Sequence, residues 1–154
     1  MVVRHYLAVV VLAVSAILVA RPTEAGGPYQ FYPITPCRLV DTRNTNGPFG
    51  GPSLLSWNTR SFQVSQYCGV PMTAQAVALN AAVLTPEAPG FLTVWPYNTT
   101  WPGTSNINVT SVSIANGCLV GVTTGSTNIS VMYGSGNPNV DHAHLIIDVT
   151  GYYQ

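Results

Sequence analysis

From residue 26 onward, the chain is a succession of short apolar or alternating runs separated by Gly, Pro, Asn and Ser. Ile129, Val131 and Tyr133 alternate with polar neighbours, which is typical of a strand with one buried and one wet face. The run from Leu145 to Ile147 is apolar on both faces and indicates a central strand. No segment has the sustained three- and four-residue apolar spacing of a helix.

These runs predict an all-β fold, a single antiparallel β-sandwich, because short strands that recur at about ten-residue spacing are typical of two packed sheets. Jelly-roll and immunoglobulin-like arrangements both fit. Residues Thr42–Asn58, rich in Asn, Gly, Pro and Ser, are predicted to form one long surface loop. The predicted strands are Tyr29–Ile34, Cys37–Asp41, Ser61–Val64, Ala76–Leu84, Gly90–Trp95, Ser105–Val109, Ser113–Ala115, Cys118–Thr123, Asn128–Tyr133 and Ala143–Thr150.

The first residues have the layout of a cleavable signal peptide. Arg4 supplies a positive start, Tyr6–Ala20 is almost wholly apolar, and Pro22 then breaks any helix. The apolar run is about 15 residues, shorter than the ~20 that a helix needs to cross a bilayer. We place the cleavage after Ala25, with Ala20 as a second site and an uncleaved N-terminal anchor as the structural alternative.

This reading divides the chain into a signal peptide over residues 1–25 and one β-sandwich domain over residues 26–154. About 129 residues remain after cleavage, which suits one domain with its own core. The mature protein is therefore predicted to be secreted, extracellular or at the cell surface, without a membrane span.

Charge is scarce, because only 6% of the residues are charged and there is no Lys. The mature part has no basic field that would attract nucleic acid or an anionic membrane. Near-zero net charge also removes the repulsion that keeps protein copies apart. We therefore expect no nucleic-acid partner, and a homo-oligomer or a self-assembling protein.

Three cysteines lie in the mature part, and an oxidising compartment favours pairing two of them. We predict a disulfide between Cys37 and Cys68, since each stands beside a turn-forming segment. Closing this loop would stabilise the fold by about 3 kcal/mol. Cys118 lies in an apolar run and is predicted to be a buried free thiol.

Arg38, Asp41, Arg43 and Asp148 hold most of the ionisable groups of the mature chain. A carboxylate in an apolar strand must be paired, so we predict structural Arg–Asp ion pairs that join the first and last strands. The alternative makes Asp41 or Asp148 a catalytic acid or base. No nucleophile elbow, phosphate loop or dinucleotide fingerprint is present in the sequence, so we predict no enzyme activity and no cofactor.

His142 and His144 are two residues apart, so on a strand they project to the same face. A metal site would need Asp141 or Asp148 to complete the ligand set. Because three or four converging ligands are required and only one His pair is visible, we predict no metal and exposed or hydrogen-bonded histidines.

Trp95, Tyr97 and Trp101 lie in a loop-like stretch where large rings can be exposed. Aromatic faces on a rigid sandwich stack on sugar rings or on another subunit. Packing of the same rings over a sheet edge is the alternative. We predict a candidate ligand surface at these three residues.

Several blocks together resemble an uncharacterised family of secreted bacterial cell-surface β-sandwich domains, which begin with P-C-R-x-x-D-T-R and end in a D-V-x-G-Y-aromatic strand. The resemblance covers nearly the whole mature chain and implies export and a β-sandwich, without an established activity. The sequence departs from the family pattern at Asp141–His144 and at Cys118. The blocks are Tyr29–Arg43, Cys68–Pro71, Ala78–Asn80, Pro89–Pro96 and Ile147–Tyr153.

These observations predict a secreted structural or adhesive cell-surface protein that self-assembles into extracellular fibres or layers. The segment Gly26–Pro36 would pair with the open sheet edge of a neighbour, which needs main-chain hydrogen bonds but no charge. The alternative is a carbohydrate-binding module that uses the exposed aromatic rings. A hydrolase that uses the paired carboxylates is the third and weakest reading.

Overall fold

The computed structural model describes residues 28–123 and 128–154, and the predicted signal peptide lies outside the described residues. The described residues form strands, turns and bends and contain no helix, so the all-β prediction is confirmed. The strands are β1 (Phe31–Asp41), β2 (Leu54–Leu55), β3 (Thr59–Gln63), β4 (Ala76–Leu84), β5 (Gly90–Pro96), β6 (Ile107–Val109), β7 (Ile114–Gly121), β8 (Asn128–Ser135) and β9 (His142–Tyr153).

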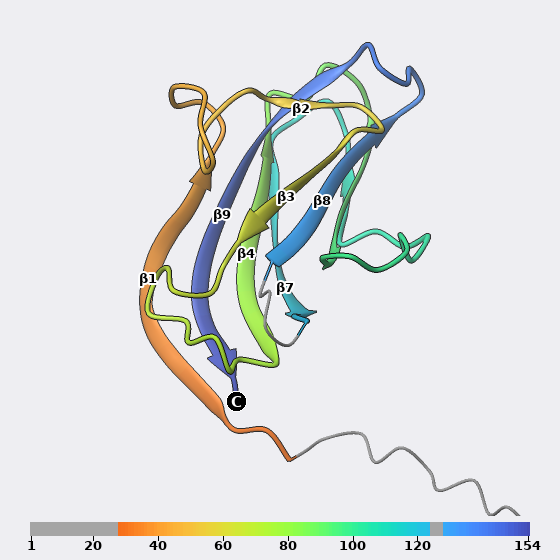
Figure 1. Cartoon of the computed structure of the whole chain (residues 1–154). Coiled ribbons are helices and arrows are strands. Elements are labelled where there is room, and N and C mark those ends of the chain that lie inside the picture. Colours follow the sequence, from red (N-terminus) through yellow and green to blue (C-terminus); the bar gives the residue numbers. More distant parts are fainter. Residues whose placement is uncertain (1–27, 124–127) are drawn as a thin grey trace, which may run out of the picture.

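The strands form two antiparallel sheets that pack face to face (Figure 1). The five-stranded sheet has the order β1-β9-β4-β7, with β2 beside β9, and the four-stranded sheet has the order β3-β8-β5-β6. Apart from β2, strands of the first half pair with strands of the second half in mirror order: β1 with β9, β3 with β8, β4 with β7, and β5 with β6. One long hairpin rolled into two sheets is a jelly roll, so the immunoglobulin-like alternative is wrong.

The core lies between the two sheets and follows the alternation of the strands. In β4, Val77, Leu79, Ala81 and Val83 are buried, and the residues between them are half-buried on the outer face. Full burial of one such aliphatic side chain stabilises the fold by about 1.5–3 kcal/mol. The bounds of β4 are those predicted from the sequence, because its period-two pattern is the clearest in the chain.

The predicted break between Tyr29–Ile34 and Cys37–Asp41 does not exist, because Phe31–Asp41 is one strand, β1. The sequence signal was Pro36, which lacks the amide hydrogen that a ladder needs. β1 is an edge strand backed by β9, and it accommodates the prolines with a register shift between Pro33 and Cys37. Proline is tolerated at such an edge or bulge.

The predicted break between Ser113–Ala115 and Cys118–Thr123 is also absent. β7 continues through Asn116 and Gly117, because β4 supplies an uninterrupted ladder of partners for these residues. Pairing with a neighbouring strand therefore overrides the local turn preference of Asn-Gly.

The stretch Thr42–Asn58 is not one surface loop, because it contains β2. Leu54 is fully buried and pairs with Ala143, so β2 continues along the same edge of β9 that β1 occupies. The residues between β1 and β2 therefore leave the sheet edge and return to it.

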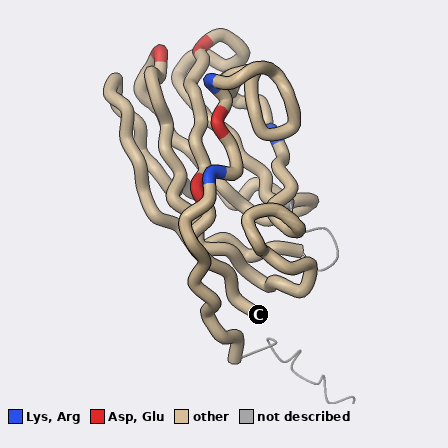
Figure 2. Tube along the Cα trace, turned by 90° about the vertical axis from the view of Figure 1, so that its left-hand side faces the viewer, with Lys and Arg blue, Asp and Glu red and all other residues tan. Residues whose placement is uncertain are grey.

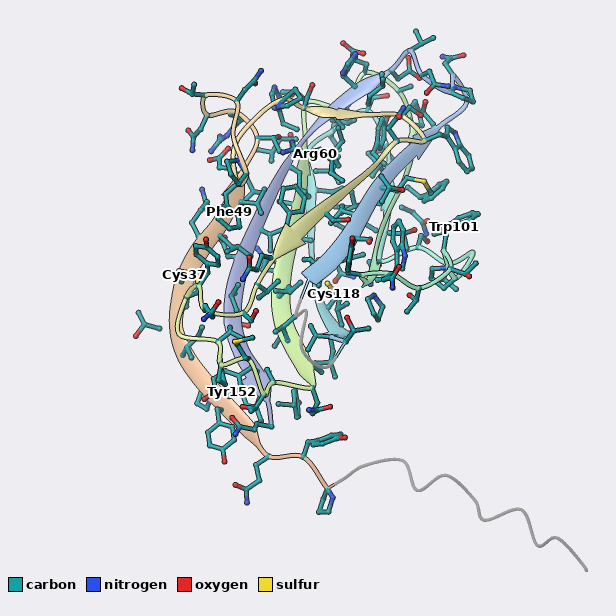
Figure 3. All side chains as sticks on the ribbon, in the orientation of Figure 1. Cys37, Phe49, Arg60, Trp101, Cys118 and Tyr152 are labelled. Carbon is teal, nitrogen blue, oxygen red and sulfur yellow. A yellow bond between two sulfur atoms is a disulfide. The ribbon has the colours of Figure 1, made fainter. Side chains whose placement is uncertain are left out.

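Arg60 of β3 holds the chain between β1 and β2 against the sandwich (Figure 3). Its guanidinium donates to the carbonyl oxygens of Gly50, at 3.0 Å, and of Pro52, and lies 4.9 Å from the ring centre of Phe62. Burial lowers the pKa of Arg60. Backbone carbonyls and a ring face, rather than a carboxylate, surround this cation.

Replacing both Cys37 and Cys68 with Ser is expected to lower the free energy of unfolding by about 3 kcal/mol. The disulfide closes a loop with a sequence separation of 31, so its loss frees the unfolded chain. Urea unfolding measures this change, with Cys118→Ser as the matched control that keeps the disulfide. Equal midpoints for the double variant and the control would contradict this role.

Candidate functional site

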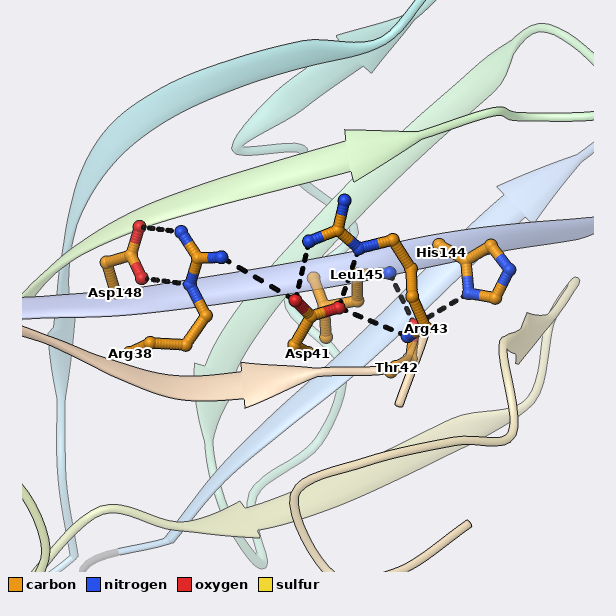
Figure 4. A network of polar contacts seen from close by, with 7 residues as sticks. All are labelled: Arg38, Asp41, Thr42, Arg43, His144, Leu145 and Asp148. Atoms are coloured by element: carbon orange, nitrogen blue, oxygen red, sulfur yellow. Dashed lines mark hydrogen bonds and ion pairs between the residues drawn. The ribbon is translucent and has the colours of Figure 1, made fainter. Parts of the chain in front are cut away.

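Four of the charged residues form one network between the first and last strands (Figure 4). Arg38 of β1 makes a two-point pair with Asp148 of β9, with Nε–Oδ1 at 2.6 Å and Nη2–Oδ2 at 3.2 Å. Asp41 makes a second two-point pair with Arg43, at 2.8 and 2.6 Å, and lies 3.6 Å from the Arg38 guanidinium. The structure thus brings together the residues predicted to join the two strands. Figure 2 shows basic and acidic residues side by side on the Cα trace.

The Asp41 carboxylate is the buried member of this network. Its side-chain hydrogen bonds from Arg43 lower its pKa from 3.8 to about 2, and the Arg43 backbone amide also donates to it. Asp148 is held by Arg38. Both carboxylates are therefore engaged as ion-pair partners, which argues against either one as a general acid or base.

The two histidines of the described chain line one cavity. The His142 Nδ1 lies 3.2 Å from the Ser53 hydroxyl, and the His144 Nδ1 lies 3.1 Å from the Thr42 hydroxyl. That Thr42 oxygen also accepts the Leu145 amide at 2.8 Å, which ties the end of β1 to β9. The cavity has a volume of about 330 Å³ and is lined by Ser53, Thr85, Glu87, His142, Ala143 and His144.

The carboxylates considered as further metal ligands lie elsewhere. Asp141 is buried and accepts a hydrogen bond from the Ser135 hydroxyl at 2.6 Å, while Asp148 faces Arg38. Glu87 lines the histidine cavity instead, and its carboxylate accepts the His142 backbone amide at 2.7 Å. Residues 28–123 and 128–154 contain no group of three His, Cys, Asp or Glu that could hold a metal ion.

The cysteines divide as the sequence predicts. Cys37 and Cys68 form a disulfide with a Cα–Cα distance of 5.6 Å. Cys118 of β7 is free, partly buried and packed against the core. Burial raises the pKa of its thiol, which disfavours the nucleophilic thiolate.

Two of the three rings predicted to be exposed are exposed, and whether they form a ligand surface stays a prediction. Trp101 and Tyr97 are both 38% exposed, but Trp95 is only 5% exposed. Trp95 faces outward from β5, yet the chain after β5 folds back over it and the Thr99 carbonyl accepts its indole N–H at 3.2 Å. The assignment of Trp95 to the ligand surface is therefore wrong, because the chain that follows it covers its ring.

Trp101 instead forms an aromatic cluster with Trp57 and Phe91. Trp57 meets Phe91 edge to face at 5.5 Å between ring centres, and it meets Trp101 in the same manner at 5.9 Å. Phe91 and Trp101 are nearly parallel, with an interplanar angle of 18° and 5.9 Å between centres. Trp57 is 41% exposed, so the aromatic cluster presents large rings to solvent.

The backbone of Trp57 is held in an unfavourable conformation. Its φ of 63° is in the left-handed region, which costs a bulky residue about 1–3 kcal/mol. Two hydrogen bonds fix it, because its backbone amide donates to the Tyr133 carbonyl and its indole N–H donates to the Ser135 carbonyl, both at 2.8 Å. The ring orientation is therefore set before any ligand arrives.

A buried polar network supports this end of β8. The Ser56 hydroxyl accepts the Ser135 amide at 2.9 Å, and the Asp141 carbonyl accepts the Ser56 amide at 2.8 Å. The Ser135 hydroxyl lies 2.9 Å from the Ser56 hydroxyl and donates to the Asp141 carboxylate. Each of these buried groups has partners, which makes the network rigid.

The other two rings are held by the four-stranded sheet. Phe91 of β5 packs over Gly134 of β8, its register partner, where a Cβ atom would overlap with the ring. The Trp101 indole N–H lies 3.3 Å from the Thr93 hydroxyl, which anchors the ring on the outer face of β5. Figure 3 shows Trp101 on the opposite side of the molecule from Cys37.

Phe91 and Trp101 are among the residues that line a groove. It has a volume of about 190 Å³, and its lining contains hydroxyl and amide groups but no ionisable side chain. Exposed ring faces beside uncharged hydrogen-bonding groups can hold a ligand that has both C–H faces and hydroxyls. The lining residues are Phe91, Trp101, Gly103, Thr104, Ser105 and Asn108.

Sequence reasoning missed Trp57 and Phe91. Trp57 falls in the stretch predicted as a surface loop, and Phe91 falls in a predicted strand. No local pattern marked either residue, and only the ring contacts of the structure join Trp57 and Phe91 to Trp101. Which of them is exposed depends on how the chain after β5 folds.

Comparison with known proteins leaves the function to be argued from these residues. No family model, curated protein or solved structure matches the chain. The resemblance to secreted bacterial surface domains therefore stays a prediction.

Asp41→Asn is expected to remove part of the acid sensitivity of the fold. The pKa of Asp41 is lowered to about 2 in the folded protein. Its contribution to the free energy of unfolding is therefore fully present above pH 3.8 and is lost as the pH falls towards 2. Urea unfolding at a series of pH values in this range gives the free energy of unfolding as a function of pH, and this free energy should fall more steeply with decreasing pH for the parent than for Asp41→Asn. Parallel curves for the parent and Asp41→Asn would show that the pair contributes nothing.

Trp95→Ala is expected to lower the free energy of unfolding by about 3–5 kcal/mol, since it leaves a cavity under the covering chain. Trp101→Ala and Tyr97→Ala remove exposed rings and should each cost clearly less. Urea denaturation of the three variants ranks them, and an equal loss for Trp95 and Tyr97 would contradict the burial of Trp95.

Proposed function

We propose that this chain is an exported adhesive module that binds neutral glycans through the aromatic cluster of Trp57, Phe91 and Trp101. The observation that carries the proposal is the exposure of two Trp rings that are fixed by hydrogen bonds beside a groove of uncharged polar groups. A pyranose ring has C–H faces for the rings and hydroxyls for the groove.

The groove favours a neutral ligand. Its lining has hydroxyls from Thr104 and Ser105 and an amide from Asn108, and none of the lining side chains carries charge. The ion-pair network around Arg38 and Asp148 belongs to the other sheet. A uronate or sulfate group would find no cationic partner among the lining residues.

The fold alone does not decide the function, since jelly rolls serve both as lectin domains and as subunits of shells. The exposed aromatic cluster supports a binding function. Rigid aromatic rings contribute large contact area at low entropic cost, and the strained Trp57 backbone is the kind of stored strain that concentrates at ligand sites.

Export is part of the proposal. A disulfide is compatible with an oxidising, extracellular location. The described part of the chain contains no helix of the length and hydropathy that spanning a membrane requires. The predicted signal peptide supplies the remaining argument for a secreted or cell-surface protein.

Trp57→Ala and Trp101→Ala are each expected to abolish retention on the neutral polysaccharides that retain the parent, because each removes an exposed stacking face. Tyr97→Ala is the matched control, since Tyr97 has the same exposed fraction as Trp101 but is no part of the aromatic cluster. Affinity electrophoresis through gels that contain each polysaccharide measures retention. Absence of retention of the parent on every neutral glycan, or equal loss with Tyr97→Ala, would overturn the proposal.

A second pair of variants tests the cluster without removing a ring. Gly134→Ala places a Cβ atom where the Phe91 ring lies, whereas Gly136→Ala meets no atom within 4 Å. The first change should weaken retention and the second should leave it unchanged.

A further inference from the structure

Residues 28–36 form an N-terminal arm at the end of the molecule where the C-terminus lies (Figure 1). The arm is paired with the last residues of β9, with Phe31 opposite Tyr153 and Tyr32 opposite Tyr152. Gln30 and Gln154 exchange two backbone hydrogen bonds at 2.9 and 3.1 Å. Ile34 of the arm also packs against the hydrophobic core, and the other contacts run along the edge of β9.

The end of β9 is shaped to receive this arm. The Phe31 ring packs over Gly151, where a Cβ atom would overlap with it, and lies 5.1 Å from the Tyr153 ring. The Tyr32 and Tyr152 rings stack at 5.2 Å between centres. We call residues 151–154 the seat of the arm.

We propose that the N-terminal arm is exchanged between copies of this chain, so that the arm of one copy occupies the seat of another in the register seen within one chain. The segment predicted to pair with a neighbour is paired here with its own chain. Exchange keeps the arm–seat contacts, because the same residues meet in both states.

The boundary of the exchangeable segment is set by two features. The register of β1 shifts between Pro33 and Cys37, so the pairing is interrupted where the arm joins the body. At Cys37 the disulfide to Cys68 fixes the chain to the body. The three residues between Pro33 and Cys37 therefore act as the hinge, and fully extended they span about 10 Å.

The partner is a second copy rather than another protein, because the seat is already seen to fit this chain's own arm. Neither the arm nor the seat contains Asp, Glu, Lys or Arg, so no side-chain charge opposes the approach of copies. The arm also has three large exposed rings, with Tyr29, Phe31 and Tyr32 all at least 40% exposed. In an assembly these rings would lie between the β-sandwiches of two copies that share an exchanged arm.

The arm and the aromatic cluster are separate. Figure 3 shows Tyr152 of the seat at the end of the molecule and Trp101 on its side. Exchange of the arm therefore leaves the groove open, and Trp57→Ala is expected to leave assembly unchanged. Loss of glycan binding and loss of exchange are distinguishable outcomes.

A mixing experiment tests the exchange. One mature chain carries Tyr32→Cys and the other carries Tyr152→Cys, both in a Cys118→Ser background, and the two are mixed at high concentration and mildly oxidised. Register partners lie within the Cα range of a disulfide, so exchange gives a cross-linked heterodimer on a non-reducing gel. The control is a mixture of the Tyr32→Cys chain with a Leu119→Cys chain, because Leu119 is an exposed position on β7 where cross-links form only by random collision. The yield of the Tyr32–Tyr152 heterodimer should exceed the yield of this control by about tenfold.

Closing the seat supplies the matched control. Gly151→Ala in the Tyr152→Cys chain places a Cβ atom against the Phe31 ring of the incoming arm, so the heterodimer should be lost. Gly136→Ala in the same chain meets no atom within 4 Å and should leave the yield unchanged. A heterodimer yield equal to the Leu119→Cys background, or one that Gly151→Ala does not lower, would overturn the proposal.

Discussion

The antiparallel pairing of the first half of the chain with the second half determines where every functional side chain of this protein lies. β8 is paired with β3 on one side and with β5 on the other, so Trp57, Gly134 and Phe91 meet although they are far apart in sequence. The same mirror order places β1 beside β9 and brings Arg38 to Asp148. The aromatic cluster and the charge network are therefore consequences of one rolled hairpin.

Strand character could be predicted from the sequence where it depends on local alternation. β4 has the predicted bounds because the pattern of Val77, Leu79 and Val83 contains all the information that a half-buried strand needs. Pro36 and Asn116-Gly117 gave false breaks, because a continuous partner strand overrides a local turn preference. β2 was not predicted, because a strand of two residues is too short to show an alternating apolar and polar pattern.

The candidate site was harder to predict for a related reason. Burial of a ring depends on what the following chain does, so the local sequence around Trp95 and Trp101 does not tell a covered ring from an exposed one. Trp57 owes its place to hydrogen bonds with Tyr133 and Ser135, which come from a distant strand. The Arg–Asp pairs were predictable, because a charge-poor chain offers few partners for a carboxylate that folding buries.

The position of the Cys37–Cys68 bond also determines how the molecule responds to mechanical load. A force that pulls Pro28 sideways, away from the edge of β9, would separate the paired residues before Cys37 one pair at a time. At Cys37 the force passes through a covalent bond into the segment around Cys68. The rest of β1 is thereby shielded, and the protein behaves as a short extensible tether attached to a body that resists stretching.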